Sequence, residues 1–326
     1  MTLITRWIAV AIFSTASCLS SLARAQDFPG APVNIVVPYP AGGGADIMAR
    51  ALAAELSSVW GKPVVVENIP GANSIIGAQR VARAAPDGHT LLMTLSGTLI
   101  GNQFLYKSLP YDPAKSFVPI SMIAKSGQLI LASSSANFSS LSDMLESAKK
   151  VPGSVTYGTP GKGSQEEILM ETISKRENVS LLSIPYKGVA PALTALLGGE
   201  IKLGVASPGL VAELMKQGRI KALAIAAPQR SSLLPGVPTT GELGLPYAIS
   251  TVWYGLFAVA GTPESIVKKL SKDVMAIARN PDFVARNMTP RGLESVANSP
   301  SEFAAEIKAE RSQMADMVRI IGLQPE

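Results

Sequence analysis

The stretch VNIVVPYPAGGGADIMARALAAELSSVW, residues 33–60, holds three local patterns in succession. Residues 33–37 form a short apolar run rich in valine, as in a buried strand. Two prolines end the run, three glycines follow, and apolar residues then recur at the spacing of one helical face. The stretch therefore predicts a β-strand, a glycine loop and an α-helix that begins in the loop.

The glycine loop is a candidate anion site. The start of a helix leaves backbone N–H groups unpaired where the helix dipole is positive, and adjacent glycines let a ligand approach the backbone closely. A tight turn that binds nothing explains the glycines equally well. Asp46, in the first turn of the helix, would repel an anion if it pointed inward. We therefore expect its oxygens to hold the amides of the loop.

The N-terminal residues have the features of an export signal. Arg6 precedes an apolar segment, and Ala23-Arg24-Ala25 resembles a signal-peptidase site, so we expect residues 1–25 to be removed and the mature protein to be exported. Serine and threonine interrupt the segment too early for a membrane-spanning helix. Lipoprotein processing at Cys18 is the alternative, and it is disfavoured because residues 15–17 lack the usual leucine.

The mature chain lacks the residue patterns typical of nucleic-acid binding or thiol chemistry. Loss of Arg6 and Arg24 leaves 27 of the 29 basic residues against 24 acidic ones, and these basic residues are scattered without interleaved aromatics, so we expect no nucleic-acid partner. Cys18, the one cysteine, would leave with the signal peptide. A core must then stabilise the fold without disulfides, and 47% hydrophobic residues are enough for one.

Strands and helices alternate along the rest of the chain, which predicts an α/β fold whose ligands lie at the carboxyl ends of parallel strands. In the first half, strands at 63–67 and 89–95 end at polar turns, and further strands at 117–124 and 128–133 flank Lys125-Ser126-Gly127. A second α/β series occupies 141–226, a Pro- and Gly-rich loop occupies 229–247, and a strand at 250–259 returns to the first series. We place a crossing between two lobes at residues 124–128 and another at 250–253. Helices at 263–279 and 301–321 complete the chain.

A second glycine loop, GTPGKGS at 158–164, precedes a predicted helix at 165–176. It fails the spacing of a nucleotide-binding P-loop, because Gly163 separates Lys162 from Ser164. Two other interpretations are compatible: an anion-facing loop, and a capping turn with Ser164 as the N-cap and Glu167 as its reciprocal partner. If two lobes face each other, both glycine loops reach the same cleft.

The residues offer little for catalysis. His89 is the only histidine, no G-x-S-x-G elbow occurs, and the acidic pairs lie on helical faces expected to be solvated. We therefore expect neither a metal site nor an enzyme, although a carboxylate-based exported hydrolase stays as the alternative. Four aromatics near the crossings either line a cleft or pack in the core: Tyr39, Tyr186, Trp253 and Tyr254.

Motifs along the whole mature chain resemble one family, the solute-binding receptors of tripartite tricarboxylate transporters, also called Bug proteins. The matching stretches are PYPAGGGAD (38–46), NIPGANSIIGA (68–78), ARAAPDGHTLL (82–92), LPYDPAKSFVPISMIA (109–124), GTPGKGS (158–164), IPYKGVAPALTALLGGEI (184–201), LPGVPTTGELGLP (234–246), WYGLFAVAGTP (253–263) and EFAAEIKAER (302–311). The resemblance implies a two-lobed periplasmic binding protein fold of the type II kind, with mixed, mostly parallel sheets flanked by helices. It also implies a periplasmic monomer that closes on a small organic carboxylate, for example a di- or aromatic acid, without a cofactor, and presents it to a membrane permease or sensor.

The resemblance also implies which residues touch the ligand. From the first lobe they are Tyr39, Ala41, Gly42, Gly43, Asp46 and Ser96; from the second they are Thr159, Gly163, Ser164, Ala206 and Ser207. Glu166 stands where the family often has histidine, and Ala206 where it often has aspartate, so these two positions are the candidates for ligand specificity. The first lobe is expected to comprise residues 26–125 and 251–326, and the second lobe residues 126–250.

Overall fold

The computed structural model describes residues 28–161 and 163–325; the predicted signal peptide lies outside the described residues. The first lobe is built on a sheet in the order β2 (Val64–Asn68), β1 (Val33–Val37), β3 (Thr90–Leu95), β9 (Thr251–Val259) and β4 (Phe117–Ser133). β1 pairs in parallel with β2 and β3, whereas β9 runs antiparallel to β3 and β4. The short β10 (Glu294–Ser295) pairs with β4.

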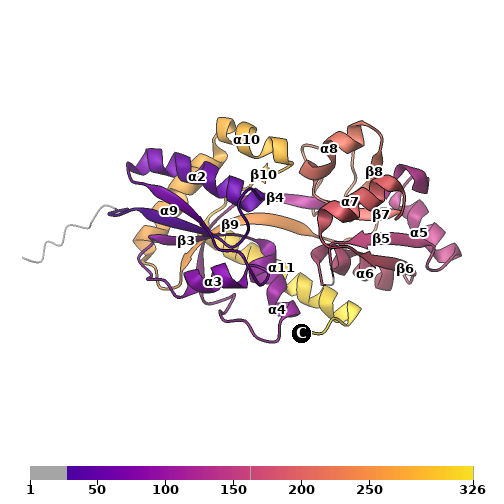
Figure 1. The fold of residues 1–326 in the computed structure, drawn as a ribbon, viewed down its shortest axis with the longest axis horizontal. Coiled ribbons are helices and arrows are strands. Elements are labelled where there is room, and N and C mark those ends of the chain that lie inside the picture. Colours follow the sequence, from indigo (N-terminus) through magenta and orange to yellow (C-terminus); the bar gives the residue numbers. More distant parts are fainter. Residues whose placement is uncertain (1–27, 162, 326) are drawn as a thin grey trace, which may run out of the picture.

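The two faces of this sheet are covered by different helices, as Figure 1 shows. On one face α2 (Gly44–Trp60), α9 (Glu264–Arg279) and α10 (Pro281–Asn287) bury the side chains of Val33, Ile35 and Val37. On the other face α3 (Ile75–Ala82) and α11 (Pro300–Ile321) pack against Val36. Successive strand residues thus enter opposite cores, which explains the continuous apolar run of β1.

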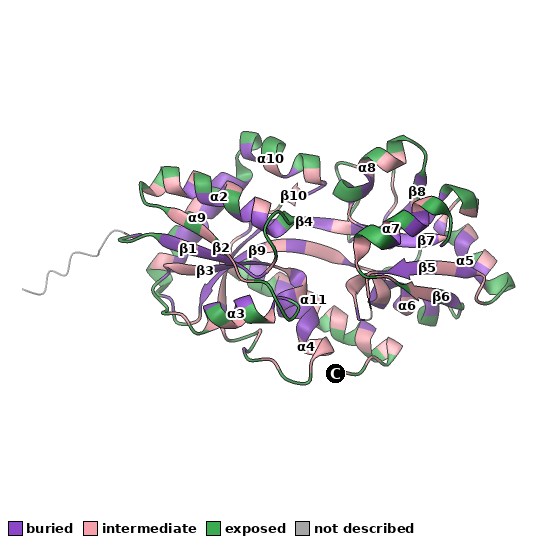
Figure 2. Cartoon of the chain, in the orientation of Figure 1, coloured by how far each residue is buried: buried purple, intermediate pink, exposed green. Residues whose placement is uncertain are grey.

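The second lobe has its own mixed sheet, in which β4 pairs with β7 (Leu203–Ala206) and β8 (Ile220–Ala226). β5 (Val155–Thr159) runs parallel to β6 (Leu181–Pro185) and β7. The flanking helices are α5 (Leu141–Lys150), α6 (Gln165–Arg176), α7 (Val189–Gly198) and α8 (Pro208–Lys216). The predicted two-lobed α/β fold is therefore confirmed, and the buried residues lie along the sheet of each lobe (Figure 2).

The expected break between strands 117–124 and 128–133 is wrong. β4 is one strand of 17 residues that passes through both sheets. Lys125, Ser126 and Gly127 stay paired with β9, so their backbone groups are satisfied without a turn. Gly127 allows a close approach here, because a Cβ at this position would lie 2.8 Å from side-chain atoms of Ile225 and Ala227.

α11 connects the cores of the two lobes. Its first half buries Phe303 and Ile307 in the first lobe, whereas Met317 belongs to the core of the second lobe. Figure 1 shows the helix extending from beneath the first sheet toward α6. Among the described residues, no helix is both long enough and apolar enough to cross a membrane.

Candidate functional site

The first glycine loop leaves the start of α2 open. Gly43 is the N-cap, with φ −74° and ψ 166°, and no side chain caps the amides of the first turn. Ala41, Gly42, Gly43 and Gly44 are all exposed. Gly44 needs its lack of a side chain, because a Cβ there would lie 2.7 Å from the hydroxyl of Tyr254 on β9. The loop therefore offers unblocked amides at the positive end of a 17-residue helix.

Asp46 turns toward the loop, as expected from the sequence. Its Oδ2 accepts the Gly42 N–H at 2.9 Å, and Arg50 Nη2 lies 2.9 Å from its Oδ1. Burial alone would raise the pKa of Asp46, but hydrogen bonds from Arg50 and from the Gly42 amide outweigh burial and hold the pKa below its usual value. Asp46 thus braces the loop as an ion pair, and its negative charge is compensated.

A network of hydroxyl groups lies behind the loop at the end of β3. Tyr39 Oη is 2.8 Å from Thr98 Oγ1, which is in turn 2.7 Å from Ser74 Oγ. Ser96, which is 1% exposed, accepts a hydrogen bond from Gln165 Nε2 at 3.3 Å. Gln165 is the first residue of α6, so this contact joins the strand end of the first lobe to the second glycine loop.

Side chains at the start of α6 already accept hydrogen bonds from the amides of Gly163 and Glu167 at the second glycine loop. Ser164 is the N-cap of α6, and its Oγ accepts the Glu167 N–H at 3.2 Å. The Glu167 carboxylate accepts the Gly163 N–H at 2.6 Å, not the Ser164 N–H that a reciprocal capping box requires, because Ser164 N donates to Gly161 O. The predicted N-cap is therefore confirmed, and the predicted reciprocal partner is shifted by one residue.

The remaining predicted residues of the second lobe lie at strand ends. Thr159, the last residue of β5, is fully buried. Ala206 ends β7 and pairs with Leu129 of β4, and Ser207 is the N-cap of α8. Glu166 is partly buried at the start of α6; burial raises the pKa of its carboxyl, and hydrogen bonds from the Glu166 backbone and Ser164 only partly oppose this.

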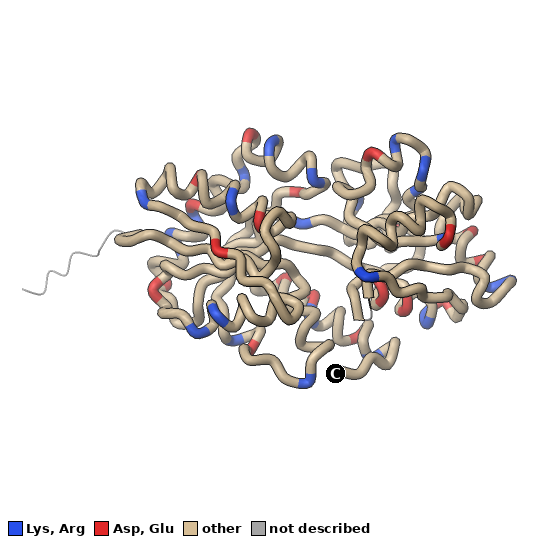
Figure 3. The backbone as a smooth tube through the Cα atoms, in the orientation of Figure 1, with Lys and Arg blue, Asp and Glu red and all other residues tan. Residues whose placement is uncertain are grey.

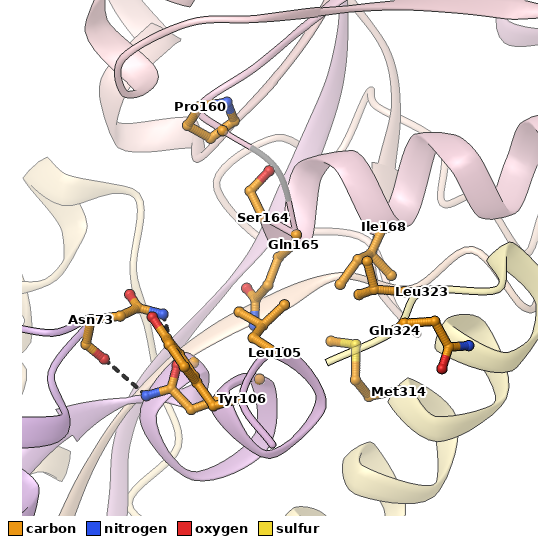
Figure 4. Close-up of a pocket in the computed structure, with 15 residues that line it drawn as sticks. Asn73, Leu105, Tyr106, Pro160, Ser164, Gln165, Ile168, Met314, Leu323 and Gln324 are labelled. Carbon is orange, nitrogen blue, oxygen red and sulfur yellow. Dashed lines mark hydrogen bonds between the residues drawn. The ribbon is translucent and has the colours of Figure 1, made fainter. Parts of the chain in front are cut away.

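A cavity of about 430 Å³ lies between the lobes, next to the second glycine loop. Of the predicted ligand-binding residues, only Gly163 and Ser164 line it. The first lobe adds residues that the sequence did not single out as ligand contacts, with Asn73 Nδ2 donating to Asn102 Oδ1 at 2.7 Å. Figure 4 shows Asn73 and Tyr106 on one side of the cavity and Ile168, Met314 and Leu323 on the other.

Sequence reasoning missed most of this cavity because its walls depend on long-range packing. Asn73 carried a signal, since it lies in a glycine-punctuated turn after a strand. Leu105, in the short α4 (Asn102–Leu105), lies so close to the second loop that a Cβ on Gly163 would be 2.5 Å from its Cδ2. Met314 and Leu323 reach the cavity only because the end of α11 crosses to the second lobe.

The four aromatics near the crossings have different roles. Trp253 is fully buried and donates from Nε1 to Glu310 Oε2 at 2.7 Å, so it is a core residue and not part of a cleft. Tyr39 and Tyr254 lie beside the first glycine loop, and Tyr186 packs on the core of the second lobe. Within the part of the chain that the structure describes, no three His, Cys, Asp or Glu residues come together as a metal site.

In Figure 3 the positions of Lys, Arg, Asp and Glu fall mainly on the helices and loops of both lobes. Among the described residues that line the cavity, none is Lys, Arg, His, Asp or Glu. The polar groups that the described lining residues offer to an anion are neutral donors: backbone amides and the side chains of Ser, Asn and Gln. Neutral donors of this kind can hold a small anion, because hydrogen bonds are stronger in a partly buried site than in bulk water.

Comparisons with known proteins show to which family the chain is similar. Residues 48–323 match the family model described as tripartite tricarboxylate transporter family receptor. The chain is 33% identical to protein BugT of Bordetella pertussis over 320 residues, which cover 98% of each chain.

Two solved structures are similar over most of the chain. One, described as "R. palustris Rpa4515 with adipate", has 30% identity and a TM-score of 0.78, covering 92% of this chain and 100% of the other. The second, MatC from Rhodopseudomonas palustris with bound malate, has 33% identity and a TM-score of 0.73, covering 89% of this chain and 100% of the other.

Proposed function

The chain belongs to the tripartite tricarboxylate transporter receptor family, and from that premise we propose that it captures a small organic carboxylate between its two lobes. The observation that carries the proposal is the open helix start at Gly43, which has no side-chain cap and faces solvent. Two relatives of known structure hold adipate and malate, and both ligands are carboxylates. The comparisons give no support to the alternative of an exported hydrolase.

The carboxylate is proposed to bind where the two lobes meet at the strand ends. The first lobe contributes Tyr39, Ala41, Gly42, Gly43, Asp46 and Ser96, and the second contributes Thr159, Gly163, Ser164, Ala206 and Ser207. Within this set we propose Gly43 as the direct backbone contact, because the Gly42 and Gly163 amides already donate to Asp46 and Glu167, whereas the Gly43 amide makes only a long hydrogen bond of 3.5 Å with Pro40 O. Asp46 then acts on the ligand only through the shape of the loop.

Lobe closure is proposed to occur about the strands that cross between the lobes. The first lobe would comprise residues 26–125 and 251–326 and the second lobe residues 126–250, with the end of α11 resting on the second lobe. β4 and β9 pair continuously through Lys125–Gly127 and Thr251–Trp253, so small backbone rotations there would move whole lobes. Closure follows ligand binding only if contacts from both lobes favour the closed state.

Membership in this receptor family, together with a similar solved structure described as a periplasmic transporter, supports the periplasm as the compartment. We expect export by removal of residues 1–25, as the sequence indicates, without lipoprotein processing at Cys18. The mature protein would act as a monomer and present its ligand to a membrane permease or sensor. Glu166 and Ala206 are proposed to set which acid is accepted.

A thermal-shift screen of the mature protein against a broad panel of carboxylates tests the proposal. A ligand at a hundredfold excess over its Kd stabilises the folded state by about 2.7 kcal/mol, which raises the Tm by several degrees. Each acid that produces a shift is repeated as its uncharged amide, which should produce none. A panel without any shift, or amides that act as well as acids, would remove the carboxylate-binding role.

A further inference from the structure

We propose that the preferred ligand is an acid with an apolar far end, held in the cavity between α4, α6 and the end of α11; this rests on the proposed carboxylate-binding function. The cavity volume of about 430 Å³ lies within the range of small-molecule sites, roughly 300–1,000 Å³. Its position next to Ser164 and Gln165 places it directly beside the proposed carboxylate site.

One end of the cavity is polar. Asn73 and Asn102 are joined by a hydrogen bond, and Gln165 bridges from the cavity wall to Ser96 at the strand end. Ser164 completes this end from the second loop. A carboxylate bound between the strand ends would therefore point the rest of the ligand into the cavity.

The other end is a wall of aliphatic and thioether side chains from three separate elements. Leu105 comes from α4 and Ile168 from α6, whereas Met314 and Leu323 come from α11 and the residues after it. Figure 4 shows Ile168, Met314 and Leu323 gathered together, with Leu105 on the side of the first lobe. Their shared surface favours an apolar group, because burying such a group removes it from water.

A second carboxylate at this end would find one polar side chain among the described lining residues, the neutral Gln324, which Figure 4 shows next to Met314 and Leu323. None of the described lining residues is charged, and Leu105, Ile168, Met314 and Leu323 are apolar. Burying an ionised carboxylate without a partner is costly, so a straight-chain diacid should bind more weakly than the monoacid with the same number of carbons. The cavity thus selects among acids by the chemical group at the end of the ligand that lies away from the recognised carboxylate.

Matched acid pairs measured by isothermal titration calorimetry test this inference. Hexanoate is compared with adipate and octanoate with suberate, on the mature wild-type protein. We expect each monoacid to bind at least tenfold more tightly than its diacid. Equal or tighter binding of the diacids would overturn the inference and leave the proposed function standing. If neither class of acid binds, the inference falls and the broad carboxylate panel decides the proposed function; if hexanamide binds as tightly as hexanoate, the carboxylate proposal falls and the apolar site remains.

A variant pair locates the preference in the cavity. Met314→Gln keeps the length of the side chain and adds a polar group to the wall. It should weaken hexanoate binding at least fivefold and change adipate binding less than twofold. The matched control is Met275→Gln on α9, a partly buried methionine of the first lobe that does not line the cavity. It should change neither affinity, and a Met314→Gln variant that behaves like this control would contradict the proposed position of the apolar group.

Discussion

The first glycine loop and the second are built alike but leave different backbone groups open. Each precedes a helix, and each is braced by a carboxylate four residues farther on: Asp46 holds the Gly42 amide and Glu167 holds the Gly163 amide. The first loop is exposed and its helix has no side-chain cap. In the second loop, Ser164 caps the helix and Gly163 packs against Leu105 of the other lobe.

The two loops have similar sequences, but this structural difference suits them to different roles in ligand binding. An open helix start suits an incoming anion, whereas a capped start serves as a wall that positions the rest of the ligand. Asp46 is charge-compensated by Arg50, so the first loop keeps a net attraction for anions. Under the proposed function, we propose that the first loop mainly recognises the charge of the ligand and that the second loop mainly shapes its surroundings.

The largest expected effect comes from closing the open helix start. Gly43 has the extended backbone that N-cap residues adopt, and the nearest atom to its Cβ position is Pro40 O at 3.4 Å, so Asp fits there. Gly43→Asp would occupy the free amides with a charged group and should weaken carboxylate binding about a hundredfold by calorimetry, without loss of thermal stability. Gly43→Asn, the neutral control, should weaken it about tenfold. Unchanged carboxylate affinity in Gly43→Asp would contradict the claim that the first loop recognises the charge of the ligand.

The next prediction concerns the pH dependence of stability near Ser96, whose hydroxyl connects Gln165 of the second lobe to Thr251 of β9; we call this contact the junction between the loops. Thr251 accepts from Ser96 through its carbonyl and donates from Oγ1 to Glu310 at 3.1 Å. Burial raises the pKa of Glu310 to about 7, assisted by the charge of Glu306 and opposed by hydrogen bonds from Trp253 and Thr251 and by Lys125. Because its pKa is raised, the Glu310 carboxyl holds its proton more tightly in the folded state than in the unfolded state, where its pKa is near 4.5. Its contribution to the free energy of unfolding is therefore fully present below pH 4.5 and is lost as the pH rises through about 7.

We therefore expect the free energy of unfolding to fall by about 2 kcal/mol between pH 5 and pH 8, after an allowance for the partial exposure of Glu310. Glu310→Gln keeps an acceptor for Trp253 and should flatten this pH dependence in urea denaturation. An equally steep profile in the variant would show that Glu310 does not titrate in this range and that the junction is not sensitive to its charge.

A pair of alanine substitutions measures the contact between the second loop and the first lobe. Gly42 and Gly163 have φ values of +84° and +74°, so alanine at either position costs about 1 kcal/mol of backbone strain. Gly163→Ala must also displace Leu105, whereas no atom lies within 4 Å of the Cβ position at Gly42. We expect Gly163→Ala to be about 1 kcal/mol more destabilising in chemical denaturation. Combining it with Leu105→Ala should remove the excess, and persistence of the excess would rule out this contact as its cause.

The smallest predicted effect is an increase in carboxylate affinity, not a decrease. Glu167→Gln keeps an oxygen that can accept the Gly163 N–H and removes a negative charge next to the site. Carboxylate affinity should rise about threefold, while stability falls by about 0.5 kcal/mol because a charge-assisted hydrogen bond becomes a neutral one. A decrease in affinity would indicate that the ligand needs the geometry that the Glu167 carboxylate imposes on the loop.

The sequence allowed prediction of those features that depend on local patterns. The run at Val33–Val37, the start of α2 beside three glycines and the N-cap at Ser164 all follow from periodicity and capping chemistry. β4 was split wrongly because Lys125-Ser126-Gly127 has the composition of a turn, and its pairing with β9 is decided by residues more than a hundred positions away. The apolar wall of the cavity was missed for the same reason, since Leu105 and Leu323 meet only in the folded chain.

The central claim is that the first loop recognises the charge of the ligand and the second loop shapes its surroundings. A crystal structure of the mature protein with a carboxylate found by the screen tests this claim most directly. We expect a carboxylate oxygen within hydrogen-bonding distance of the amides that follow Gly43, with the Gly163 N–H still bonded to Glu167. A carboxylate seated on the Gly163 amide, with Glu167 displaced and the start of α2 empty, would contradict it.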